Sequence, residues 1–313
     1  MKMLGCSIAE DSRKRLPFAR IFEPLGVVID LSRSTDMEVI VRNKESRVTN
    51  TLALVSEILE AGCMEPYTAA SLRGIILFME QQIFGRCGAI ATRTLARRFE
   101  GENVGWKLSA FDKKLLEWLP RYFKLAPERV IRFGPGCEPV IICTDGAYEK
   151  GVATIGGTIV DGEFRQAFGC TLPGMLVSRW TKERDVVQCI GQVELLPVWV
   201  ARALWGLQLK GRRVLWLIDN ESARFALIAM SSPVTASADI LWSIADLEIS
   251  LQTLSWYERV PTASNLADGP SRLCFEEVRA LGFDIVNTDS VMSSFGIASS
   301  ELASSRVSSG VTL

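Results

Sequence analysis

The sequence predicts an α/β protein in which a mixed β-sheet flanked by helices follows a mainly helical region. Helical spacing of apolar residues dominates the first part of the chain, whereas short apolar runs alternate with helical patterns in the second. Between them, around residues 132–137, the composition shifts to glycine and proline. We therefore expect one domain over residues 1–133, a second over residues 134–287, and a serine-rich disordered tail over residues 288–313.

The first region is expected to open with a short hairpin and to continue with helices. Two apolar runs separated by a polar turn predict strands at residues 25–31 and 37–41. Gly62 is a suitable end for the first helix, and Pro120 is expected to end the last one, because proline has no backbone N–H to continue it. The helical patterns cover residues 48–59, 72–83, 86–98 and 111–119.

The second region alternates strands with helices. An apolar run and a hairpin turned at Asp161-Gly162 come first, and an amphipathic helix follows them. The expected strands cover residues 140–144, 151–160, 163–172, 213–218 and 254–260, and the expected helices cover residues 192–209, 220–230 and 236–251.

The composition excludes several classes of site. The chain has no histidine, which rules out Ser-His-Asp and Cys-His catalysis and zinc sites with histidine ligands. Its eight cysteines are scattered without a C-x-x-C pair, as in a reduced intracellular protein. The net charge of −1 gives no overall basic field for nucleic acid. No targeting or membrane-spanning segment is evident, so we expect an intracellular protein without membrane contact.

Four acidic residues stand in distinctive settings and are the candidate catalytic and metal-binding residues. Asp145 and Asp219 end apolar strand-like runs, Glu194 lies in an amphipathic helix pattern, and Asp268 opens a late turn. Each alone could be a turn former or a helix cap. Together they favour one cluster of carboxylates, which is a hard-oxygen site that suits Mg²⁺ or Mn²⁺.

These motifs resemble a known family. The order of three strands, a helix, a strand, helices and an acidic turn resembles the ribonuclease H-like fold. The signature Asn265-Leu-Ala-Asp-Gly-Pro-Ser-Arg272, with Asp219-Asn220 and the Gln-x-Glu-Leu pattern at residues 192–195, resembles the ribonuclease H domain of DIRS-type and gypsy-type retrotransposon polyproteins. The first region is similar to the thumb or connection segment that follows the polymerase palm there, so the resemblance covers residues 16–274.

The resemblance implies an endonuclease that hydrolyses the RNA strand of RNA–DNA hybrids. In such a site Asp145 would bridge two Mg²⁺ ions, Glu194 and Asp219 would complete one side, and Asp268 would hold the ion that activates water. Four arginines are candidates for contacts to nucleic-acid phosphates, although solvated surface charge explains any one of them equally well: Arg212, Arg213, Arg224 and Arg272.

The chain also departs from the family's pattern. It has no Tyr-x-Asp-Asp polymerase motif and no palm, so polymerase activity is not expected, and the missing polymerase portion is an implied partner. The alternative function is a catalytically inactive or domesticated remnant that binds nucleic acid or protein. Another nuclease of this fold, such as a resolvase or integrase, is disfavoured by the signature at residues 265–272.

Overall fold

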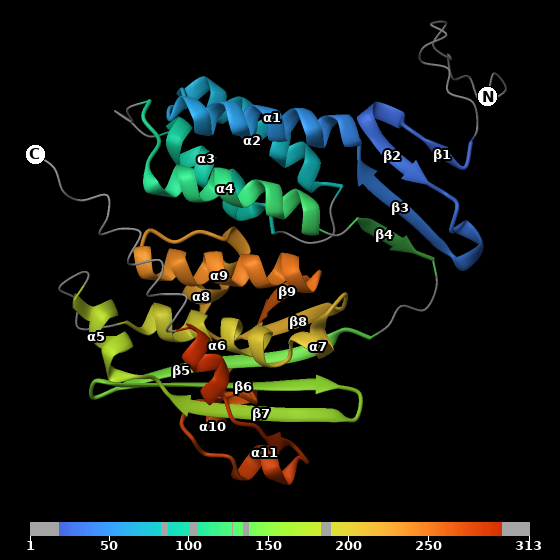
Figure 1. Cartoon of the computed structure of the whole chain (residues 1–313). Coiled ribbons are helices and arrows are strands. Elements are labelled where there is room, and N and C mark those ends of the chain that lie inside the picture. The colour runs from blue at the N-terminus through green and yellow to red at the C-terminus, as the bar shows by residue number, and fades with distance from the viewer. Residues whose placement is uncertain are drawn as a thin grey trace, which may run out of the picture.

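A computed structural model of the chain describes residues 19–82, 87–100, 106–126, 128–133, 138–182 and 189–295. The domain boundary expected after residue 133 falls at residues 134–137, which lie outside the described residues. Most of the expected tail, residues 296–313, also lies outside them. The described elements form two parts, a small sheet with helices α1–α4 and a larger sheet with helices of its own (Figure 1).

The first sheet is antiparallel, with the strand order β1-β2-β3-β4. The hairpin of β2 and β3 is the predicted one. β4 pairs with β3 although α1–α4 separate them in the chain. It was not predicted from the sequence, because a run with only two apolar residues has no strand pattern. The strands are β1 Ile21–Phe22, β2 Val27–Asp30, β3 Glu38–Asn43 and β4 Arg129–Arg132.

Between β3 and β4, the described residues form four helices: α1 Glu45–Ala61, α2 Pro66–Glu80, α3 Ala89–Glu100 and α4 Ala110–Leu125. α1 ends at Gly62 as predicted, with a left-handed φ of 65°. The expected stop at Pro120 is wrong, because α4 continues through it. The proline forfeits one backbone hydrogen bond. A capping box at Ser109 and a buried face that includes Leu119 and Tyr122 hold the helix together nevertheless.

The second sheet is mixed, with the strand order β10-β7-β6-β5-β8-β9. β5, β6 and β7 are antiparallel neighbours, whereas β8 runs parallel to β5, and β9 runs parallel to β8. With helices packed against it, this sheet confirms the predicted fold class. The strands are β5 Val140–Glu149, β6 Val152–Asp161, β7 Phe164–Thr171, β8 Arg213–Ile218, β9 Leu254–Arg259 and β10 Asp284–Ile285.

Helices cover the second sheet and connect its strands. α6 packs on β5 and β6, α9 packs on α6, and the short α10 contacts β5, β6 and β7. The single helix expected over residues 192–209 is divided at Trp205 into α6 and α7. The helices are α5 Gly174–Lys182, α6 Ile190–Leu204, α7 Gly206–Leu209, α8 Glu221–Ala229, α9 Thr235–Leu251, α10 Asp268–Ser271 and α11 Glu276–Ala280.

The start of the expected disordered tail is ordered. Residues 289–295 are helical, and the ring centroid of Phe295 lies 4.7 Å from that of Trp199. Val291 and Met292 pack against the same core. The serines of this segment predict disorder, but its apolar residues form one helix face that packs on the core.

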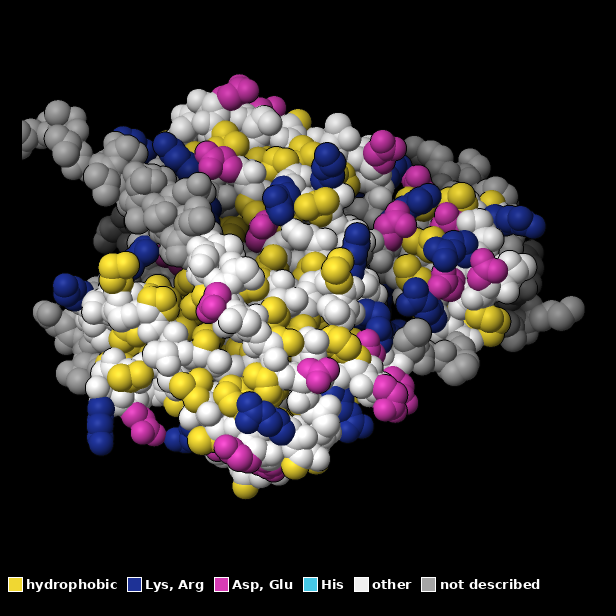
Figure 2. Space-filling model, turned by 60° about the horizontal axis from the view of Figure 1, so that its bottom comes forward, with side chains coloured by type: hydrophobic (Ala, Val, Ile, Leu, Met, Phe, Trp, Pro, Cys, Tyr) yellow, Lys and Arg dark blue, Asp and Glu magenta, His cyan; other side chains and the backbone are white. Residues whose placement is uncertain are grey.

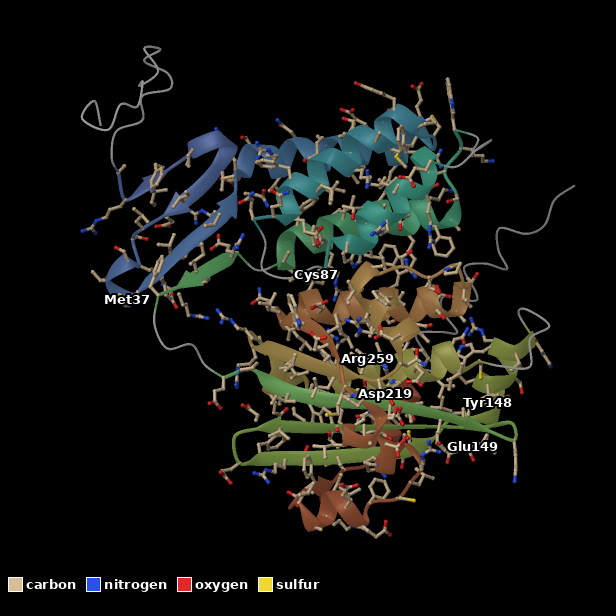
Figure 3. All side chains as sticks on the ribbon, turned by 180° about the vertical axis from the view of Figure 1, so that it is seen from behind. Met37, Cys87, Tyr148, Glu149, Asp219 and Arg259 are labelled. Carbon is tan, nitrogen blue, oxygen red and sulfur yellow. The ribbon has the colours of Figure 1, made fainter. Side chains whose placement is uncertain are left out.

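One hydrophobic core connects the two parts of the molecule. Trp118 of α4 meets Trp242 of α9 edge to face, with ring centroids 5.5 Å apart. Trp118 Nε1 also donates a hydrogen bond to Asp246 Oδ1 at 3.3 Å. Cys87 is buried at this junction (Figure 3). The helices of the first part therefore extend the core of the second.

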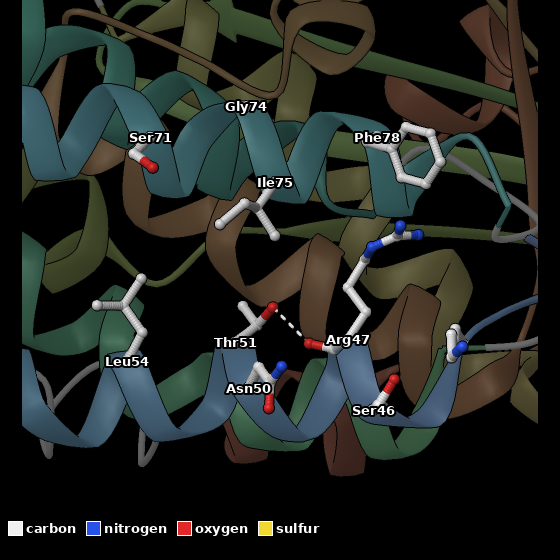
Figure 4. A pocket seen from close by; sticks show the side chains of 10 residues that line it. Ser46, Arg47, Asn50, Thr51, Leu54, Ser71, Gly74, Ile75 and Phe78 are labelled. Carbon is white, nitrogen blue, oxygen red and sulfur yellow. Dashed lines mark hydrogen bonds between the residues drawn. The ribbon is translucent and has the colours of Figure 1, made fainter. Parts of the chain in front are cut away.

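A groove of 690 Å³ lies between α1 and α2 (Figure 4). Arg47 lies 4.3 Å from the ring centroid of Phe78, and it donates a hydrogen bond to the Gly26 carbonyl. The hydroxyl of Thr51 donates to the carbonyl of Arg47. No aspartate or glutamate is among the described residues that line the groove, so it is separate from the acidic residues singled out in the sequence.

The surface carries charges of both signs. Figure 2 shows Lys and Arg interspersed with Asp and Glu on the face that it presents, which agrees with the net charge of −1. Among the described residues, no helix combines the length and the apolar character that crossing a membrane requires.

We expect Trp118→Ala to lower the free energy of unfolding by about 3 kcal/mol, because it opens a cavity at the contact between α4 and α9. Trp106→Ala is the matched control: Trp106 is 59% exposed, and its loss should cost less than about 1 kcal/mol. Urea unfolding of both variants measures the difference. Equal costs would contradict a shared core at this junction.

Candidate metal centre

Strand pairing places two of the acidic residues side by side. Thr144 of β5 pairs with Ile218 of β8 in a parallel register. The next residues in the two strands' direction are Asp145 and Asp219. Neighbouring strands lie about 4.8 Å apart, so both aspartates stand at the same edge of the sheet.

Helix α6 brings Glu194 to the same place. Its close approach to β5 depends on Gly146, since a Cβ atom there would lie 2.5 Å from the carbonyl oxygen of Val193. Successive residues of a strand face opposite sides of the sheet. The pair Asp145-Gly146 therefore supplies a carboxylate toward one face and room for α6 on the other.

The structure brings three of the four predicted carboxylates together. One oxygen from each of Asp145, Glu194 and Asp219 lies within 4.8 Å of the other two. Asp145 is 5% exposed and Glu194 is 6% exposed. Asp219 lies within the part built on the six-stranded sheet, far from Met37 in the small sheet (Figure 3).

Burial and mutual repulsion perturb these acids. Burial raises the pKa of Glu194 to about 8, and the charges of Asp145 and Asp219 act in the same direction. Burial also raises the pKa of Asp145 to about 6; a hydrogen bond from Ser271 opposes this rise, and the charges of Asp219 and Asp268 reinforce it. Ionised carboxylates are thus unfavourable here unless positive charge joins them.

The donor set fits a hard divalent cation. Two buried oxygens, Glu194 Oε2 and Asp219 Oδ1, have no hydrogen-bond partner among the described residues. Unpaired buried acceptors are costly, and a cation would satisfy them. Carboxylate oxygens are the ligands that Mg²⁺ and Mn²⁺ prefer. Asp145, Glu194 and Asp219 are therefore the residues that would hold the ion.

Two glycines beside Asp145 form the bed on which α10 rests. Asp145 pairs with Gly156 of β6, and Gly156 pairs with Gly169 of β7. Cross-strand partners share one face of a sheet. A Cβ atom on Gly156 would lie 2.3 Å from the Ser271 nitrogen, and one on Gly169 would lie 2.2 Å from the Pro270 oxygen. α10 can reach Asp145 only because neither glycine has a side chain.

The signature segment is anchored by its first residue. The Asn265 side chain donates a hydrogen bond to the Thr144 carbonyl at 3.3 Å and accepts one from the Ala267 N–H at 3.1 Å. It thereby joins the turn before α10 to the residue that precedes Asp145. At the other end of the turn, the Ser271 hydroxyl donates to Asp145 Oδ2.

Asp268 is a neighbour of the three carboxylates and is not in the set whose oxygens lie within 4.8 Å of one another. Its side chain is 35% exposed and lies 3.3 Å from the guanidinium of Arg272, one turn further along. Its charge still reaches Asp145. The structure thus groups Asp145, Glu194 and Asp219 most tightly, and Asp268 stands beside them, paired with Arg272.

The four candidate arginines are distributed unevenly. Arg272 lies beside the carboxylates and contacts Asp268 and Glu149, and Arg224 of α8 pairs with Glu221 at 3.0 Å. Arg212 and Arg213 stand at the start of β8, about 20 Å of strand away from Asp219. Arg212 there holds Asp161 at 2.9 Å. Nearness in sequence misplaced these two, because a strand separates its ends.

Two polar residues of the site were not assigned roles from the sequence. Asn220 caps α8 by accepting the Ala223 N–H, and its amide donates to Glu194 Oε1 at 3.2 Å. Ser271 contacts Asp145. Both lie in the motifs that carry the candidate acids: Asn220 comes directly after Asp219, and Ser271 comes three residues after Asp268. Their position beside acidic residues was the available signal.

The solved structures that match this chain include ribonuclease H domains and a reverse transcriptase. RNase H1 from the archaeon Halobacterium salinarum is 14% identical, with a TM-score of 0.33, over 45% of this chain and 99% of that one. LC11-RNase H1 in complex with an RNA/DNA hybrid is 14% identical, with a TM-score of 0.31, over 45% of this chain and 99% of that one. The foamy viral protease-reverse transcriptase in complex with double-stranded DNA is 12% identical, with a TM-score of 0.28, over 76% of this chain and 38% of that one. The sequence matches no family model and no curated protein.

We expect Gly156→Ala to destabilise the fold by about 1–3 kcal/mol, because its new methyl group would overlap the backbone of α10. Gly74→Ala in α2 is the matched control, since a Cβ atom there meets nothing within 4 Å. Alanine should stabilise that helix by up to about 1 kcal/mol. Thermal unfolding of both variants measures the contrast. If Gly156→Ala leaves the melting temperature unchanged, α10 does not pack on Gly156 as described.

Without metal, stability should depend on the protonation of Glu194. Its pKa rises from 4.5 to about 8 on folding, because the buried site favours the protonated carboxyl. The free energy of unfolding should therefore be highest below pH 4.5, and this contribution should be lost as the pH rises through 8. Glu194→Gln stays neutral and should gain stability over the parent between pH 5 and pH 9. For each unit by which folding raises the pKa of Glu194, the gain in the free energy of unfolding of the variant is at most about 1.4 kcal/mol.

Urea unfolding in EDTA across this pH range measures the difference between the parent and Glu194→Gln. Glu60→Gln, an exposed glutamate of α1, is the control and should follow the parent at every pH. A pH-independent difference for Glu194→Gln would show that the carboxyl is not perturbed as described.

Proposed function

We propose that this chain is a metal-dependent endonuclease of the ribonuclease H type, which hydrolyses the RNA strand of RNA–DNA hybrids. The observation that carries the proposal is the set of three carboxylates, Asp145, Glu194 and Asp219, with oxygens within 4.8 Å of one another. Such a set is unfavourable as a structural element alone, because like charges are forced together away from water. It is suited to a divalent cation.

The chain's own groups have separate tasks in this reaction. A bound divalent cation supplies the charge that activates a water molecule and stabilises the leaving oxygen of the phosphodiester. Asp145 and Asp219 present oxygens from rigid strands, and Asn220 holds Glu194 by its hydrogen bond at 3.2 Å. The Asp268 side chain is 35% exposed, in contrast to the buried Asp145 and Glu194, so we assign it to the side of the site from which the attacking water enters.

The substrate class follows from the signature at residues 265–272, which resembles the ribonuclease H domains of retroelements. A hybrid would be recognised by its shape and its 2′-hydroxyls rather than by base sequence. Arg272 and Arg224 are the candidate phosphate contacts nearest to the carboxylates. The retroelement origin, and a polymerase portion as partner, belong to the same proposal.

Asp145→Asn tests the function most directly. It preserves size and removes one charge from the centre of the set, so cleavage of the RNA strand in a labelled hybrid should fall by about 10³-fold. The parent should require Mg²⁺ or Mn²⁺ and should lose activity in EDTA. Initial rates on end-labelled hybrid, with single-stranded RNA and double-stranded DNA as other substrates, measure activity and specificity together.

Asp36→Asn makes the same chemical change on the exposed surface of the first part and should leave the rate unchanged. A parent that binds hybrid without cleaving it, in the presence of either ion, would support the alternative of a non-catalytic binding module. Cleavage that survives Asp145→Asn would contradict the assignment of the carboxylates.

A further inference from the structure

Ser271 makes a contact that packing alone does not require. Its side chain has no exposed surface, and its hydroxyl oxygen lies within hydrogen-bond distance of Asp145 Oδ2. The same oxygen is 2.8 Å from the carbonyl of Asp268. A hydroxyl has one proton, so it can donate to only one of these acceptors at a time. An ionised carboxylate is the stronger acceptor, and the proton therefore belongs to Asp145.

Close packing of α10 and hydrogen bonds on its flanks fix the position of the Ser271 hydroxyl. α10 rests on Gly156 and Gly169, and a Cβ atom on Gly269 would lie 2.8 Å from the Cys274 carbonyl oxygen. The Ser271 N–H bonds to the Ala267 carbonyl at 2.8 Å. Asn265 ties the preceding turn to β5 through Thr144. The donor is thus held rigidly in front of a carboxylate that sits on the central strand of the sheet.

Of the three clustered carboxylates, the other two are held differently. Glu194 receives a side-chain hydrogen bond from Asn220 at 3.2 Å, and its Oε2 has no hydrogen-bond partner among the described residues. Asp219 Oδ1 likewise has none there. Asp145 differs from them in that a fully buried hydroxyl donates to its carboxylate. That distinction matters if Asp145 must keep one orientation while a cation binds and leaves.

We propose that Ser271 is a positioning residue for the metal site: by donating to Asp145 Oδ2 it holds the central carboxylate in the orientation that a divalent cation requires. The inference rests on the proposed metal-dependent function and goes beyond it, since it assigns a serine of α10 to the site. Loss of such a partner of a liganding group typically weakens metal binding by about 10–100-fold.

Two variants separate the hydrogen bond from the packing. Ser271→Ala removes the hydroxyl. Ser271→Cys keeps nearly the same volume, and its thiol is a weak donor. Mg²⁺ and Mn²⁺ affinity is measured on the full chain by titration calorimetry and by the rise in melting temperature with ion concentration. Ser237→Ala, which removes another buried serine hydroxyl, from α9, is the matched control.

We expect Mg²⁺ affinity to fall at least about tenfold in Ser271→Ala, to fall by an intermediate factor in Ser271→Cys, and to stay at the parent value in Ser237→Ala. If Ser271→Ala melts at a lower temperature in EDTA and binds Mg²⁺ like the parent, Ser271 is only a packing residue and the inference is overturned. Parent-like binding by Ser271→Cys alone would also overturn it, because shape rather than donor strength would then suffice.

Asp145→Asn, titrated beside these variants, distinguishes failure of the inference from failure of the proposed function. A parent that binds neither ion, like Asp145→Asn, overturns both. A parent that binds ions while Asp145→Asn does not, with no loss in Ser271→Ala, overturns only the role of Ser271.

Discussion

Three carboxylates confined in one place are the constraint on which the rest of this architecture depends. Their repulsion and desolvation are reflected in pKa values of about 6 for Asp145 and about 8 for Glu194. A fold keeps such groups together only if rigid elements over-determine their positions. Here β5, its parallel neighbour β8 and helix α6, which packs closely on Gly146, supply that rigidity. The shared hydrophobic core connects these elements to the helices of the first part.

Glycine placement lets helices pack closely on both faces of the sheet. Gly146 of β5 admits α6 on one face, and Gly156 of β6 and Gly169 of β7 admit α10 on the other. The site therefore draws on both faces of the sheet, although its ligands converge at one edge. A larger residue at any of these glycines would act on the carboxylates through backbone displacement, without touching them.

The sequence was most informative where the pattern is local. The strand at residues 213–218 and the hairpin before it were local predictions of this kind: the strand was predicted correctly, and the hairpin of β6 and β7 forms with its two-residue loop at Gly162-Glu163, one position beyond the predicted Asp161-Gly162. The grouping of Asp145, Glu194 and Asp219 could be expected from their settings, since two of them follow apolar strand-like runs and the third lies in an amphipathic helix pattern. The pairing of β4, the continuation of α4 through Pro120 and the helix at residues 289–295 depend on tertiary contacts that no short window contains.

Asp268, Arg212 and Arg213 illustrate the same limit at the level of single side chains. Their residue types were informative, but their directions were set by an ion pair in the first case and by the length of a strand in the other two. The glycine bed was invisible for a related reason: its members lie on different strands, and only the register aligns them.

The distance along the chain between Asp145 and Ser271 has a consequence for how the protein is made. The two are 126 positions apart, so during synthesis the central strand emerges long before the turn that completes its surroundings. Contacts this remote in sequence form late in folding. A growing chain would carry the Asp145 carboxylate without its hydroxyl partner until the segment that contains Ser271 has also emerged. The surroundings of Asp145 would thus be completed by a part of the chain that is made much later than the strand that carries it.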